Sequence, residues 1–155
     1  MLVGGTMQLT RFSDFALRVL MYVHAAGDRL VTIEEIASAY RVSKPHLMKV
    51  VSALTRAGYI TTVRGRTGGI TLARSADKIR LGDVVRRTEP DFALVECFTT
   101  GSECVIDGCC RVPNILRRAL DAFLAELDRH TVASIALRPK ELRETFPEAF
   151  SKADT

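Results

Sequence analysis

All four cysteines of this 155-residue chain lie in one short stretch, Cys97-Phe-Thr-Thr-Gly-Ser-Glu-Cys104-Val-Ile-Asp-Gly-Cys109-Cys110. The stretch contains two glycines and no apolar periodicity, which predicts a loop rather than a core element. Thiolates bind soft metals, and cysteines clustered in a loop are typical of metal sites or of regulatory disulfides. This loop is therefore the first candidate for chemistry.

The spacing of the cysteines distinguishes between the kinds of site. Structural zinc sites usually use pairs of cysteines two to four residues apart. Here six residues separate Cys97 from Cys104, and four or five separate Cys104 from Cys109 or Cys110. The spacing favours an iron–sulfur cluster held by three thiolates, with a fourth ligand from elsewhere. Zinc, a regulatory disulfide and inert thiols stay open as alternatives.

Composition and charge narrow the class of protein. Apolar residues make up 47% of the chain, yet no apolar run approaches the roughly 20 residues of a membrane span. The leader, in which either Met1 or Met7 is the start, lacks the basic and apolar segments of a signal peptide. We therefore expect a cytoplasmic protein, where stable disulfides are uncommon.

Positive charge is concentrated in the first part of the chain. Residues 1–90 contain 14 Lys and Arg against 7 Asp and Glu, whereas residues 91–155 contain 8 against 11. This asymmetry is typical of a module that binds a polyanion, joined to a segment with another role.

The basic part has the pattern of a helix-turn-helix. A first helix is expected from about Thr10 to Ala26, and a second over 33–40, capped by Thr32. After a three-residue turn, Ser43 caps a third helix. Its candidate DNA contacts are Ser43, Lys44, Pro45, His46, Lys49 and Arg56. A merely solvated basic face is the plain alternative.

A β-hairpin follows the third helix. Segments 59–63 and 69–73 are strand-like, and Arg64-Gly-Arg66-Thr-Gly68 joins them. Arginine suits phosphates and a narrow minor groove, and glycine allows the backbone to approach them. With a short helix over 81–87, residues 7–90 are predicted to form a winged helix-turn-helix that binds double-stranded DNA. An adaptor that uses this fold without DNA stays open.

The last part is predicted to be helical. Leu116, Leu120, Phe123 and Leu127 form a seam in a helix from Pro113 to about Leu137. A helix of about 25 residues would be about 37 Å long, more than the module can cover. We therefore assign residues 91–112 to the cysteine loop, 113–138 to a dimerisation helix and 139–155 to a tail. In that tail Phe146 and Phe150 dock and 151–155 are loose.

Several segments resemble the Rrf2 family of transcriptional regulators. They are Met7-Gln-Leu-Thr-Arg-Phe-Ser-Asp-Phe-Ala-Leu-Arg18, Ser43…His46-Leu-Met-Lys49, Leu54-Thr-Arg-Ala-Gly-Tyr59, Val63-Arg-Gly-Arg-Thr-Gly-Gly-Ile70 and Ile79-Arg-Leu-Gly-Asp-Val-Val85. The resemblance extends from Met7 to about Leu137. Within the family the chain is most similar to the nitric-oxide-responsive repressors. The nearest rivals, regulators of cluster assembly, have a histidine at the position of Pro113 and Ser-Lys-Gly-Arg-Tyr at residues 11–15.

The resemblance implies a ligand set. It places the cluster ligands at Cys97, Cys104 and Cys110, leaves Cys109 as an extra cysteine, and supplies Asp14 from the other subunit. It further implies a homodimeric repressor with a [4Fe–4S] cluster, released from a two-fold DNA site when nitric oxide nitrosylates the iron. The alternative is an iron- or redox-responsive regulator with a [2Fe–2S] cluster.

The expected fold is mainly α-helical with a small β-hairpin, a winged helix-turn-helix followed by a long dimerisation helix. His24, His46 and His130 have no companion nucleophile and no metalloprotease spacing. We therefore expect a regulator and not an enzyme.

Overall fold

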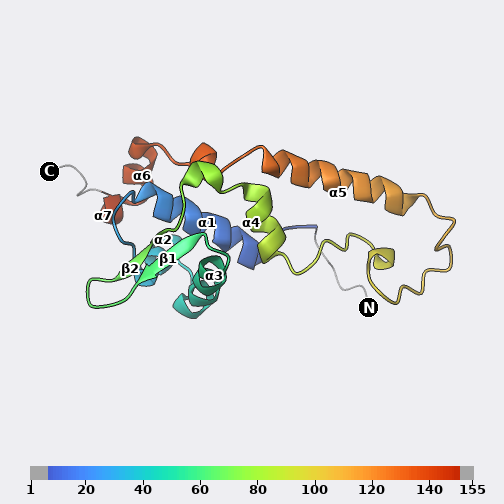
Figure 1. Cartoon of the computed structure of the whole chain (residues 1–155), viewed down its shortest axis with the longest axis horizontal. Coiled ribbons are helices and arrows are strands. Elements are labelled where there is room, and N and C mark those ends of the chain that lie inside the picture. The colour runs from blue at the N-terminus through green and yellow to red at the C-terminus, as the bar shows by residue number, and fades with distance from the viewer. Residues whose placement is uncertain (1–6, 151–155) are drawn as a thin grey trace.

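A computed structural model of the chain describes residues 7–150. The expectations for the leader and for residues 151–155 lie outside the described residues. The helices are α1 (Arg11–Ala25), α2 (Ile33–Tyr40), α3 (Lys44–Arg56), α4 (Leu81–Thr88), α5 (Val112–Asp128), α6 (Pro139–Thr145) and α7 (Pro147–Phe150). Strands β1 (Ile60–Val63) and β2 (Gly69–Leu72) form one antiparallel sheet. The predicted fold class is confirmed (Figure 1).

The starts of the first two helices follow from their capping residues. The Thr10 hydroxyl accepts a hydrogen bond from the Ser13 N–H at 3.2 Å, which caps α1. Thr32 caps α2 in the same way. Ser43 occupies the N-cap position of α3, as predicted, but its side chain makes no capping hydrogen bond. The prediction that Ser43 caps this helix with its side chain was therefore wrong. Arg41, with φ of 54°, turns the chain between α2 and α3.

The core joins the helix-turn-helix to the hairpin. α1, α3 and α4 bury aliphatic faces, and each fully buried aliphatic side chain contributes roughly 1.5–3 kcal/mol. These residues include Ala16, Val19, Leu20, Val23, Leu47, Val50, Leu54, Val84 and Val85. The hairpin is fixed to this core because Ile70 exchanges two backbone hydrogen bonds with Val31, at 2.7 and 3.0 Å. The winged helix-turn-helix therefore has one continuous interior.

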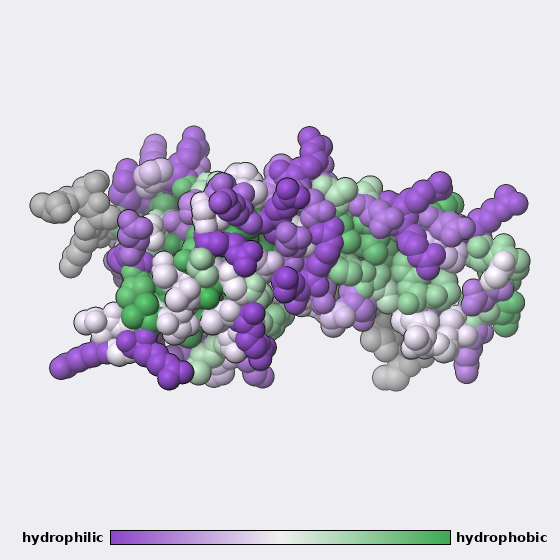
Figure 2. Space-filling view, in the orientation of Figure 1, coloured by the Kyte–Doolittle hydropathy of each residue, from purple (hydrophilic) through white to green (hydrophobic). Residues whose placement is uncertain are grey.

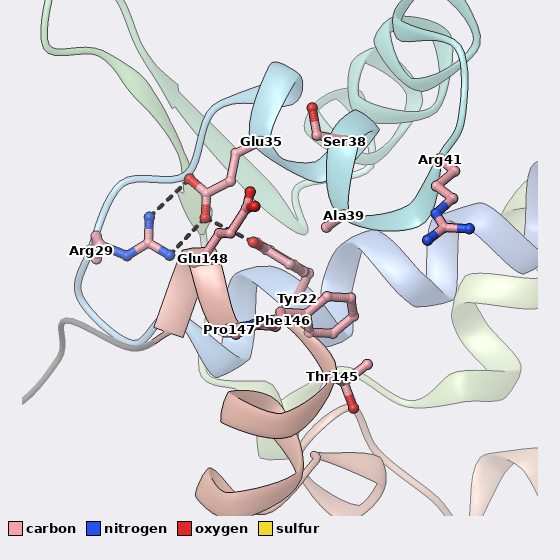
Figure 3. Close-up of a pocket in the computed structure, with 11 residues that line it drawn as sticks. Tyr22, Arg29, Glu35, Ser38, Ala39, Arg41, Thr145, Phe146, Pro147 and Glu148 are labelled. Carbon is pink, nitrogen blue, oxygen red and sulfur yellow. Dashed lines mark hydrogen bonds and ion pairs between the residues drawn. The ribbon is translucent and has the colours of Figure 1, made fainter.

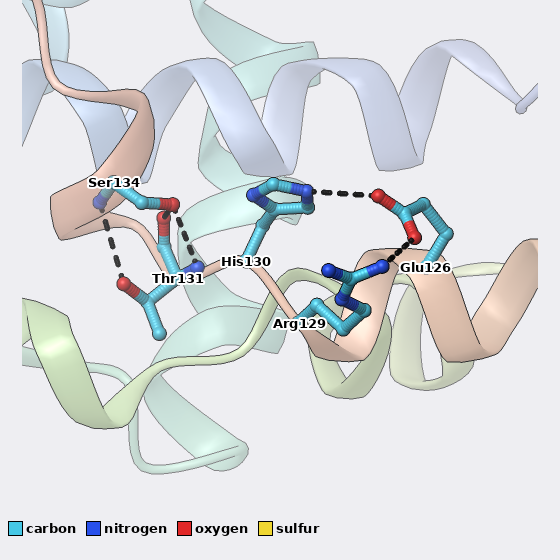
Figure 4. A network of polar contacts seen from close by, with 5 residues as sticks. All are labelled: Glu126, Arg129, His130, Thr131 and Ser134. Atoms are coloured by element: carbon cyan, nitrogen blue, oxygen red, sulfur yellow. Dashed lines mark hydrogen bonds and ion pairs between the residues drawn. The ribbon is translucent and has the colours of Figure 1, made fainter.

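The predicted long helix ends early. α5 has 17 residues and ends at Asp128 rather than near Leu137, so that extent was wrong. The backbone beyond α5 pairs with the start of α4: the Leu81 N–H donates to the His130 carbonyl at 3.0 Å, and the Val132 N–H to Ile79. A local network at this turn includes Thr131 and Ser134 (Figure 4). These contacts divert the chain from a helical path.

The C-terminal segment docks on the helix-turn-helix, as predicted for Phe146 and Phe150. Phe150 is buried, with its ring centroid 5.3 Å from that of Tyr22, and Phe146 lies 5.5 Å from Tyr40. Burial raises the pKa of Tyr40 to about 12. Figure 3 shows how α6 and α7 approach α1 and α2 around a hollow of about 580 Å³. The segment from α6 to α7 thus packs against the helix-turn-helix.

Within residues 7–150, no helix has the length and hydropathy needed to cross a membrane.

Candidate functional site

The outer face of α3 carries most of the predicted DNA contacts. Ser43, Lys44, Pro45, Lys49 and Arg56 are all exposed. Lys44 is also ion-paired with Glu34 of α2, a partner that the sequence pattern did not reveal. Met48 lies among these polar groups with 53% of its surface exposed. The face is basic with one apolar side chain, a composition that suits contact with phosphates and base edges.

His46 departs from the predicted outer face. Its ring packs edge-on against Phe15 of α1, with centroids 5.3 Å apart. Nε2 is buried and has no hydrogen-bond partner among the described residues. The reason is helical spacing, because His46 precedes the core residue Val50 by one turn and lies on the same side of α3. His46 therefore supports the α1–α3 contact and does not belong to the exposed basic face.

The hairpin forms the predicted wing. Arg64 and Arg66 are exposed at its tip, where Gly65 takes a φ of 119° that favours glycine. Hydrophilic side chains project from this end of the molecule in Figure 2. The hairpin follows α3 directly and contacts it through β1, so wing and recognition helix lie on one side (Figure 1). Both carry exposed basic side chains.

The cysteine loop lies at the opposite end of the molecule from the hairpin and leads into the start of α5 (Figure 1). All four cysteines are free thiols, and Cys97, Cys104 and Cys110 are half-buried, whereas Cys109 is exposed. Cys109 Sγ is turned back onto its own loop and lies 3.2 Å from the Ile106 carbonyl. The three thiols implied as ligands are thus the shielded ones.

Asp14 occupies the first turn of α1. Its carboxylate is ion-paired with Arg18, and 45% of its side chain is exposed. Within residues 7–150, no three His, Cys, Asp or Glu side chains of one chain are gathered closely enough to hold a metal ion. The structure of one subunit therefore gathers neither Cys97, Cys104 and Cys110 with one another nor Asp14 with them. Reduced, half-buried thiols on one loop do suit an iron–sulfur cluster in donor chemistry.

Two further residues that contact the candidate site were not predicted from the sequence. Arg18 pairs with Asp14 and lies over the rings of Phe15 and Tyr40. The four-residue spacing of Asp14 and Arg18 was a signal for this pair. Arg117 of α5 lies over the Phe98 ring, and no sequence pattern pointed to that contact.

The comparisons with known proteins agree with this architecture. Residues 9–138 match the Rrf2 family, described as an iron-dependent transcriptional regulator. The chain is 41% identical over 140 residues to the HTH-type transcriptional regulator NsrR of Bacillus licheniformis, covering 89% of this chain and 98% of that protein. It is 44% identical over 144 residues to the NsrR of Geobacillus kaustophilus, covering 92% and 98%.

Solved structures show the same fold at lower identity. CymR, described as the global cysteine regulator of B. subtilis, matches with a TM-score of 0.70 at 24% identity, over 84% of this chain and 97% of that one. IscR of T. potens matches with a TM-score of 0.66 at 22% identity, over 83% and 85%. The relatives are named as regulators, in agreement with the prediction that the chain is not an enzyme. The chain belongs to the Rrf2 family of transcriptional regulators.

Proposed function

We propose that the chain is a homodimeric repressor that binds a two-fold DNA site and holds an iron–sulfur cluster, through which nitric oxide controls DNA binding. The observation that carries this proposal is the set of three half-buried, free cysteines on the one loop that leads into α5. The identity to NsrR-named regulators over most of the chain supports it.

The surface of α5 supports the dimer. Against the rest of the described chain no residue of α5 is buried, and Ile115 and Phe123 are 55% and 45% exposed. Figure 2 shows apolar surface on the half of the molecule that contains α5. Exposed apolar side chains on one helix of this kind are stabilised by packing against a second copy. Paired recognition helices could then enter successive major grooves on one face of the DNA.

The ligands are Cys97, Cys104 and Cys110 of one subunit and Asp14 of the partner subunit. The exposure of Asp14 leaves its carboxylate accessible to another chain, and a hard oxygen donor suits the iron least protected by thiolates. When bound, a [4Fe–4S] cluster supplies iron that reacts with nitric oxide.

The role of the protein is to join the loop of one subunit to α1 of the other. Since α1 packs directly against the recognition helix through Phe15 and His46, a loop that holds Asp14 also constrains the position of α3. Loss of this link changes the spacing of the two recognition helices. For each base that a recognition helix can then no longer reach, binding weakens by about 1–3 kcal/mol.

A second candidate is an iron- or redox-responsive regulator with a [2Fe–2S] cluster. The same shielded thiols serve this function, and the two candidates differ in signal and in iron content. About two irons per chain and no response to nitric oxide would favour it.

The proposed function is tested by DNA binding. A labelled duplex is first selected with anaerobically purified protein from a random-sequence pool, and its fluorescence anisotropy is then followed during additions of nitric oxide. We expect binding before the addition and release after it, and a Cys104→Ser variant whose binding no longer depends on nitric oxide. Binding that is unaffected by nitric oxide in the wild type would contradict the proposal.

A further inference from the structure

The cysteine loop is fixed by few contacts, and they divide it into two parts. In the first part, the Glu96 carboxylate accepts a hydrogen bond from the Glu103 N–H at 3.1 Å. This contact brings together the residues that precede Cys97 and Cys104. In the second part, the Ile106 carbonyl accepts the N–H groups of Cys109 and Cys110. Neither contact fixes the first part of the loop to α5, which follows Cys110 in the chain.

Arg117 makes that connection. Its guanidinium carbon lies 5.0 Å from the centroid of the Phe98 ring, within the range of a cation–π contact. Phe98 follows Cys97 directly and belongs to the short 3-10 helix Glu96–Phe98, whereas Arg117 lies on α5 seven positions after Cys110. The contact therefore links the segment that contains Cys97 to α5, which begins two residues after Cys110.

The neighbourhood of Arg117 is also positively charged. A shallow hollow of about 610 Å³ on α5 is lined by Arg111, Arg117 and Arg118 together with one carboxylate, Asp121. No ion pair joins Arg117 to a carboxylate within the described residues.

We propose that Arg117 is a positioning residue of the cysteine loop, which holds the segment around Cys97 against α5 by stacking on Phe98. This inference rests on the proposed function, because the loop is taken as the cluster site. The contact depends on the planar guanidinium, because a guanidinium can lie flat over the ring face and a lysine ammonium group cannot. Arg118, its neighbour in the sequence, stacks on no aromatic ring of residues 7–150 and supplies a matched control.

The first test uses the protein without a cluster. Anaerobic alkylation with iodoacetamide, followed by peptide mass spectrometry, gives the reaction rate of each thiol. We expect Arg117→Ala and Phe98→Leu each to raise the rate at Cys97 about two- to fivefold, with no change at exposed Cys109. Thermal unfolding should be unchanged. This measurement separates failure of the inference from failure of the proposed function, because it needs no cluster.

The second test uses the loaded protein and follows loss of its visible absorbance in the presence of an iron chelator. Arg117→Ala and Phe98→Leu should each accelerate the loss about two- to fivefold, and the double variant should do no more than either. Arg117→Lys should recover only part of the effect, and Arg118→Ala should match the wild type. Wild-type rates in Arg117→Ala, equal effects of Arg117→Ala and Arg118→Ala, or additive effects in the double variant would each overturn the proposal.

Discussion

Asp14 and Arg18 form an ion pair on the surface of α1, with 2.9 Å between the Asp14 Oδ2 and the Arg18 Nη2. Both side chains are nearly half exposed, and pairs of this kind contribute about 0.3–0.5 kcal/mol to the free energy of unfolding. The fold therefore depends little on this carboxylate. Its carboxylate is accessible to a second subunit, and this accessibility supports the proposal that Asp14 is the fourth ligand.

Replacement of Asp14 by alanine should affect the cluster and not the fold. We expect Asp14→Ala to shorten the half-life of the visible absorbance under chelator by about tenfold or more, because one ligand is removed. The free energy of unfolding, measured with urea on the cluster-free protein, should change by less than about 0.5 kcal/mol. Arg18→Ala is the control, because it breaks the same ion pair and keeps the carboxylate. If the two variants lose absorbance equally fast, Asp14 is not a ligand.

The two adjacent cysteines should differ in their effect on iron content. Cys110 is half-buried, whereas Cys109 is exposed and turned toward the Ile106 carbonyl. We therefore expect Cys109→Ser to retain iron and sulfide and Cys110→Ser to lose them. Chemical analysis of anaerobically purified variants gives the answer, and the reverse result would transfer the third ligand to Cys109.

Charge reversal on the basic surface should weaken DNA binding in a salt-dependent way. Lys49→Glu and Arg64→Glu each remove a cation that can bind phosphate, from α3 and from the wing. The slope of log affinity against log salt, measured by anisotropy with a labelled duplex, should fall by about one for each phosphate that is no longer neutralised. Lys140→Glu on α6 is the matched control and should leave the slope unchanged. An unchanged slope in both test variants would favour an adaptor that does not bind DNA.

Stability should depend on pH through Glu35. Burial alone would raise the pKa of this carboxyl, but hydrogen bonds from Arg29 and Tyr22 hold it below its usual 4.5. A lowered pKa in the folded state means stabilisation that is present above about pH 4.5 and is lost as the pH falls through the folded value. Glu35→Gln should therefore be less stable than the wild type by about 1 kcal/mol at neutral pH. Urea unfolding should show this difference shrinking on acidification, and a constant difference would contradict the assignment.

Local signals in the sequence were sufficient for most of the fold. Thr10, Thr32 and Pro45 mark helix starts that depend on neighbouring residues, and the structure has those helices where they were expected. The end of α5 was not predictable from local sequence. His130 and Val132, just beyond the helix, form backbone hydrogen bonds with Leu81 and Ile79, which are far away in the chain. Periodicity cannot reveal such a competing long-range partner.

In the candidate site, too, the sequence predicted the features that depend on neighbouring residues and missed those that depend on contacts with distant ones. The thiol-rich loop and the arginines of the wing were evident from residue type and spacing. The inward packing of His46 depends on Phe15 of another helix, and the position of Arg117 over Phe98 depends on how the loop folds back on α5. The proposed dimer and the proposed fourth ligand involve a second chain, so they depend on contacts that a pattern within one chain does not predict.

The most direct measurement is iron and sulfide analysis with visible absorbance, on protein purified without air, before and after addition of nitric oxide. We expect brown protein with about four irons per chain. Nitric oxide should bleach the visible absorbance of the protein to the same extent as it releases the protein from DNA. Colourless protein that binds the same duplex with full affinity, and does so equally well with nitric oxide present, would contradict the central claim.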